Sequence, residues 1–184
     1  MMLDRDERRR WAFLEAGPAA AAVAWGIPVR SVTIEGPRPQ TVVGTSFVTK
    51  DNTRLERLCA MALSGAAAEE FYCGSCRGAR VDDEIAREYL AQAFEPSRVE
   101  AELASLRTWA RWMVLTPWAQ KRVRLVAVAL RMHGTLDGAV ITALCGTRRA
   151  RPAELVVDPD PRPEGERHDA AKLQSARAGD QVAP

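Results

Sequence analysis

The spacing of apolar residues predicts a mainly helical chain, with a first helix at about residues 4–25. Its buried face should hold a stripe of alanines together with Trp11, Leu14 and Val23. Gly26 follows at the position where a helix C-terminus favours glycine. Pro18 lies inside this segment and lacks the amide hydrogen that a helix interior requires. The pair Gly17-Pro18 is therefore a candidate point for the segment to divide into two helices.

Two extended segments are expected after this helix. Val29, Val32 and Ile34 lie among polar residues, which is consistent with a strand. Residues 36–39 contain glycine and two prolines and predict a turn. A second strand is expected at about residues 41–49, so the chain should carry a small hairpin or sheet after its first helix.

The remaining pattern predicts five more helices. Asn52 or the preceding Asp51 suits an N-cap, prolines occupy the first turns of two helices, and Gly134 ends one of them. Their expected positions are about residues 52–73, 82–94, 96–115, 117–133 and 136–144, with Thr135 capping the last. The fold class is therefore mainly α (α+β), a bundle of about six helices with a small sheet. We expect a helical domain over residues 1–146 and a disordered polar tail over residues 147–184.

Composition narrows the range of partners. The 184 residues are 47% hydrophobic and 27% charged, with a net charge of only +2. Such a balance does not favour nucleic-acid binding, and the arginines at positions 8–10 read as a solvated helix face. No apolar run approaches the about 18 residues of a membrane span, and the charged start does not resemble a signal peptide. We therefore expect a cytoplasmic protein without a membrane span.

One stretch of the first helix carries chemistry. Glu15-Ala16-Gly17 is followed by an alanine-rich run, by Gly26, and by Pro28-Val29 leading to Val32-Thr33-Ile34. It resembles the active-site helix of the FtsH-type zinc peptidases, which reads His-Glu-Ala-Gly-His, then a small-residue helix, a glycine and a strand. The resemblance implies that Glu15 corresponds to the general base.

Two later segments are also similar to that family. Residues 63–70 resemble its Leu-Ala-Gly-x-Ala-Ala-Glu-Glu helix, and this resemblance implies that Glu69 and Glu70 correspond to acids that support the site. Residues 78–86 resemble its Gly-Ala-Ser-x-Asp-x-x-x-Ala pattern, in which the aspartate is the third zinc ligand. Asp82 takes that position, and Asp83 is the alternative if the alignment shifts by one. The resemblance spans residues 8–144 and extends to small stand-alone bacterial relatives.

The two metal-binding histidines of the family motif are missing. Leu14 and Pro18 stand at their positions, and neither side chain has a lone pair to offer zinc. Glu15 would then act without a metal-polarised water, the main source of acidity in this chemistry. The only histidines, His133 and His168, lie at a helix end and in the tail. No cofactor is expected, with zinc as the alternative.

The cysteines offer a weaker alternative. Cys73 and Cys76 form one Cys-x-x-Cys pair, whereas a structural zinc site usually needs two such pairs or added histidines. Cys59 and Cys145 could complete a set of four, although both fit helix core positions. A redox role would require a low-pKa thiol at a helix N-terminus. Free thiols are the simpler expectation, as is a core position for the tryptophans at 109, 112 and 118.

The sequence therefore predicts a degenerate FtsH-type peptidase domain, catalytically inactive, that binds a peptide or protein through the former cleft. Two alternatives remain open: an active metalloendopeptidase with atypical ligands or ligands from another subunit, and a cysteine-based metal or redox module. Because Glu15 and Asp82 are costly to bury unpaired, each should reach solvent, a backbone donor or an arginine such as Arg80.

Overall fold

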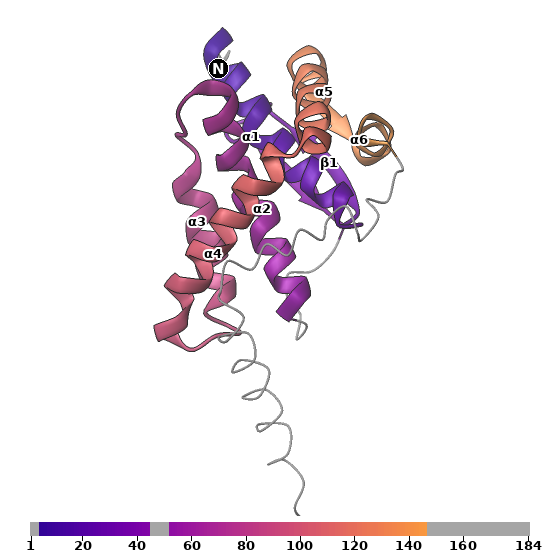
Figure 1. Ribbon diagram of the computed structural model, residues 1–184. Coiled ribbons are helices and arrows are strands. Elements are labelled where there is room, and N and C mark those ends of the chain that lie inside the picture. The colour runs from indigo at the N-terminus through magenta and orange to yellow at the C-terminus, as the bar shows by residue number, and fades with distance from the viewer. Residues whose placement is uncertain (1–3, 45–51, 147–184) are drawn as a thin grey trace, which may run out of the picture.

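The computed structural model describes residues 4–44 and 52–146. Within these ranges the chain forms six helices and a small antiparallel sheet, which confirms the predicted mainly α class (Figure 1). The elements in chain order are α1 Arg5–Ala24, β1 Val29–Thr33, β2 Gln40–Val43, α2 Asn52–Cys73, α3 Ala79–Leu90, α4 Pro96–Leu115, α5 Pro117–His133, β3 Thr135–Asp137 and α6 Gly138–Cys145. The predicted tail, and the part of the second strand beyond residue 44, lie outside the described residues.

Helix α1 is continuous through Pro18, so the expected division at Gly17-Pro18 is wrong. Asp4 caps its start by accepting a hydrogen bond from the Glu7 amide at 2.8 Å. Pro18 leaves the Leu14 carbonyl without its usual amide partner. That carbonyl faces α2, where it lies 2.7 Å from the position that a Cβ on Gly65 would occupy. The helix remains whole because it packs along its length against neighbouring elements.

Helices α1 and α2 cross at unusually small residues. A Cβ on Gly17 would lie 2.3 Å from the Ser64 carbonyl oxygen, so only glycine fits there. The Ser64 hydroxyl donates to the Met61 carbonyl at 2.6 Å, which satisfies this polar group inside the contact. The two backbones can therefore approach closely, and the alanine stripe of α1 is buried at the same interface.

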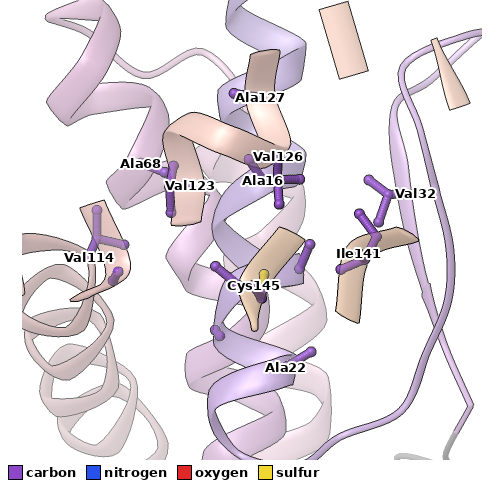
Figure 2. Close-up of a cluster of buried hydrophobic side chains, with 14 of the residues drawn as sticks. Ala16, Ala22, Val32, Ala68, Val114, Val123, Val126, Ala127, Ile141 and Cys145 are labelled. Atoms are coloured by element: carbon purple, nitrogen blue, oxygen red, sulfur yellow. The ribbon is translucent and has the colours of Figure 1, made fainter. Parts of the chain in front are cut away.

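Two hydrophobic cores flank α2. The first, which we call the alanine-rich core, lies among α1, α2, α5, α6, the end of α4 and the sheet, and Figure 2 shows Ala16, Val126, Ile141 and Cys145 converging in it. The second lies among α2, α3 and α4 and includes Leu103. α2 contributes to both cores, which explains why it is the central helix of the bundle.

The sheet has the order β2-β1-β3 with antiparallel pairs. β3 replaces the predicted start of the last helix: Leu136 pairs with Val32, and the helix begins at Gly138 with Asp137 as N-cap. The Asp137 carboxylate accepts from the Val140 amide at 2.8 Å. Thr135 therefore belongs to a strand and does not cap the helix. Its partner strand β1 lies about a hundred residues earlier in the chain.

Helix α3 also departs from its predicted bounds. It begins at Ala79 and ends at Leu90, whereas residues 82–94 were expected. The start shifts by one turn, so Asp82 lies in the first turn. The amides of Gln92 and Ala93 bond to the carbonyls of Tyr89 and Leu90 in tight turns that stop the helix.

Among the described helices, none combines the length and the apolar character that crossing a bilayer requires.

Candidate functional site

Leu14 lies where α1, α2 and the start of α3 meet. Its Cδ1 atom lies 3.3 Å from the position of a Cβ on Gly65, and its Cδ2 atom lies 2.8 Å from that of a Cβ on Gly78. The Oδ2 atom of Asp82 borders the same point on Gly65, also at 3.3 Å. Two glycines thus make room for the Leu14 side chain, and Asp82 lies beside the same point on Gly65.

Glu15 is a buried carboxyl group with one side-chain partner. It is 8% exposed, and Oε2 accepts a hydrogen bond of 2.6 Å from the hydroxyl of Thr41 on β2. Burial raises the pKa of Glu15 to about 7, although the bond from Thr41 acts in the opposite direction. The donor to Glu15 is thus a threonine hydroxyl, whereas solvent, a backbone donor or an arginine was expected.

Asp82 keeps partial exposure and has no cationic partner among the described residues. Burial, together with the smaller effects of the nearby charges of Glu15, Asp83 and Glu69, raises the pKa of Asp82 to about 7. Of the expected partners, Arg80 is excluded because its Nε bonds to Glu84 at 2.9 Å one turn along α3, and the partial exposure of Asp82 agrees with the expected alternative of solvent. Near neutral pH these carboxyl groups therefore retain protons that isolated carboxyl groups would lose.

Glu69 is a buried acid that holds the loop before α3. It is 2% exposed, and its carboxylate accepts from Arg10 at 3.2 Å, from the Cys76 thiol at 3.3 Å, and from the amides of Arg77 and Gly78 at 3.1 and 3.2 Å. These bonds fix the loop that precedes α3 and hence the position of Asp82. The neighbouring Glu70 instead points to the surface, where it pairs with Arg111.

The cysteines do not form a common site. Cys59 lies in the second core, among α2, α3 and α4, whereas Cys145 lies in the alanine-rich core. The possible set of four cysteines is therefore not assembled. Burial raises the pKa of Cys73, and burial together with Glu69 raises the pKa of Cys76 to about 11. A reactive thiol needs a lowered pKa, so neither cysteine has the environment of a redox residue.

The residues at this site do not fit a zinc ion. Within residues 4–44 and 52–146, no three His, Cys, Asp or Glu side chains converge to hold a metal. Leu14 and Pro18 contribute hydrocarbon, and two partly protonated carboxyl groups fall short of the three protein ligands of a catalytic zinc site. His133 lies at the exposed end of α5, and His168 lies outside the described residues.

Two features of the site carried no signal in the sequence. Thr41 looks like an ordinary strand residue until β2 packs beside α1, and the loop contacts of Glu69 depend on residues 76–78 folding back toward α2.

A separate pocket of about 240 Å³ lies at the far end of α1, lined by Trp25, Pro28 and Arg57 among others. It does not include Glu15 or Asp82.

The raised pKa of Glu15 gives a pH-dependent prediction. Its value is about 7 in the fold against 4.5 for the free group, so the native state loses stability as pH rises from about 4.5 to 7. Glu15→Gln removes this loss. We expect the variant to match the wild type at pH 4 and to exceed it by about 3 kcal/mol at pH 8, since the pKa rises by about 2.5 units, from 4.5 to about 7, and each unit corresponds to about 1.4 kcal/mol.

Urea unfolding at pH 4 and pH 8 measures this difference. Glu88→Gln, on the exposed side of α3, is the matched control and should leave the stability unchanged at both pH values. A loss of stability for Glu15→Gln that is equal at pH 4 and pH 8 would show that the carboxyl group is not held in its protonated form.

A comparison with known proteins adds no relatives: no protein-family model and no curated protein sequence matches this chain.

Proposed function

We propose that this chain is a non-catalytic relative of the FtsH-type zinc peptidases that binds an extended peptide or protein segment. One observation carries the proposal. The three segments that resemble the family converge around Gly65, where Leu14 and Asp82 border the same point and Glu69 fixes the adjoining loop. At this point the positions that would hold the metal are occupied by hydrocarbon.

The absence of catalysis follows from the chemistry of the remaining groups. A metallopeptidase base removes a proton from water whose pKa the metal has lowered to about 7. Glu15 faces a threonine hydroxyl and has a pKa near 7, so without a metal it lacks a water acidic enough to activate. The carboxyl groups thus remain as parts of a surface that can bind.

The sheet offers a means of binding. Among the described strands, β2 is at an edge, because the order is β2-β1-β3. An edge strand presents unpaired backbone groups to which an extended peptide can add as a further strand. Thr41 belongs to β2 and bonds to Glu15, so a peptide on this edge would run beside the former catalytic helix.

No observation favours the alternatives. An active enzyme with atypical ligands needs donors that the described residues do not bring together, and it would have to take them from another subunit. A cysteine-based module needs reactive or clustered thiols, whereas Cys76 donates its hydrogen to Glu69.

Unfolded casein serves as a probe for both parts of the proposal. In the presence of zinc we expect no cleavage of labelled casein above a protein-free blank. Saturating casein should slow hydrogen exchange at the β2 amides by about tenfold, while amides of α4, such as those of Leu103 and Leu106, remain unchanged. Zinc-dependent cleavage would overturn the inactive assignment, and unprotected β2 amides would overturn binding at this edge.

A further inference from the structure

The outer face of α5 combines exposed apolar and cationic side chains. Residues three and four apart lie together on a helix, and the exposed positions of α5 accordingly form one band, which we call the α5 stripe. Its members are Lys121, Arg124, Leu125, Val128, Arg131 and Met132. Val128 is 52% exposed and Met132 is 71% exposed. The opposite face of α5 is buried in the alanine-rich core, so the stripe faces away from that core.

The charge of the stripe is one-sided. α5 contains no acidic residue. Within the part of the chain that the structure describes, no carboxylate forms an ion pair with Lys121, Arg124 or Arg131. Arg124 instead lies over the ring of Tyr72, 5.5 Å from its centroid. Apolar side chains among unneutralised cations suit a partner that combines acidic and apolar residues.

The chain itself contains such a segment. Residues 154–160 read Glu-Leu-Val-Val-Asp-Pro-Asp, so that three large apolar side chains lie among three acids, with no cation between them. This composition is the complement of the α5 stripe, which has three apolar and three cationic members. Within the sequence of residues 147–184, the segment holds the only run of adjacent large apolar residues.

The described chain ends close to the stripe. Arg122 of α5 donates from Nε to the Cys145 carbonyl at 2.9 Å, so the end of α6 lies against the first turns of α5. Seven residues lie between Gly146 and Glu154, and the eight steps from one to the other can span up to about 27 Å. The stripe from Lys121 to Met132 is roughly 17 Å long. The segment can therefore reach every member of the stripe.

We propose that residues 154–160 of this chain bind the α5 stripe, with Leu155, Val156 and Val157 covering its apolar members and the acids facing its cations. A short tether gives the segment an effective concentration in the millimolar range, so modest contacts suffice to hold it. The bound segment closes the exposed apolar face of α5. This contact is independent of the peptide edge on β2.

Oxidation of Met132 by peroxide in the full chain tests the proposal. A covered methionine oxidises slowly, and a segment bound for two-thirds of the time slows the reaction about threefold. Replacing Leu155, Val156 and Val157 by serine should raise the Met132 oxidation rate by about threefold or more. Replacing Glu154, Asp158 and Asp160 by lysine should do the same. Met61 and Met113, each 3% exposed, should stay slow in every variant and so report an intact fold.

Leu173→Ser is the matched control outside the segment and should leave the Met132 rate unchanged. Equal Met132 rates in the wild type and the serine variant would overturn the proposal. Protection that disappears on dilution would overturn it in favour of a segment from a second copy. Protection that appears only with phosphatidylserine-containing vesicles would overturn it in favour of a membrane surface.

Discussion

Replacing Glu69 with alanine is expected to lower the free energy of unfolding by about 3–5 kcal/mol, because it removes a buried acceptor and leaves its donors unsatisfied. The carboxylate holds the amides of Arg77 and Gly78, the thiol of Cys76 and the Arg10 guanidinium. Its loss should also free the loop before α3. Urea unfolding measures the stability, and hydrogen exchange at the Gly78 amide measures the loop.

Glu70→Ala is the matched control for this change, since the two acids are neighbours on α2. Glu70 forms an exposed pair with Arg111, and such pairs contribute less than about 1 kcal/mol. If both alanine variants lose the same small amount of stability, Glu69 is not the residue that fixes the loop.

Gly17→Ala is expected to cost about 3 kcal/mol or more. Its new Cβ would lie 2.3 Å from the Ser64 carbonyl oxygen and 3.0 Å from the Ala68 side chain. The Ser64 carbonyl belongs to the backbone of α2, so α1 and α2 would have to separate, and the alanine-rich core would lose its close packing. Thermal and urea unfolding both report the loss.

Gly44→Ala offers a glycine control, because a Cβ there meets its nearest atom at an ordinary 3.4 Å. We expect a neutral or slightly stabilising effect, as is usual where alanine fits the backbone. A Gly17 variant as stable as this control would mean that the helices do not cross as closely as described.

Most of the helical part of this fold could be predicted from local signals. Asn52, Pro96 and Thr116 mark helix starts in the sequence, and Gly134 marks an end, because each of these residues acts on its own segment. The break at Pro18 was wrongly predicted because the residue that accommodates the free Leu14 carbonyl, Gly65, lies on another helix. β3 was missed because three residues form a strand only beside β1.

The site was predictable only in part. The resemblance to a peptidase family singled out Leu14, Glu15 and Asp82, and the structure brings them near one another. The resemblance could not show which atoms surround each of these groups. The raised pKa of Glu15 depends on burial beneath β2, and the loop-holding role of Glu69 depends on three hydrogen bonds formed by residues 76–78. Such properties arise from tertiary contacts that no local pattern encodes.

The zinc content of the purified protein tests the central claim most directly. Elemental analysis after incubation with zinc and removal of unbound ion should find no stoichiometric metal in the wild type. The double variant Leu14→His with Pro18→His should gain about one zinc per chain, because it places two imidazoles four residues apart on α1, near Asp82. Stoichiometric zinc in the wild type that is lost on Asp82→Ala would contradict the account.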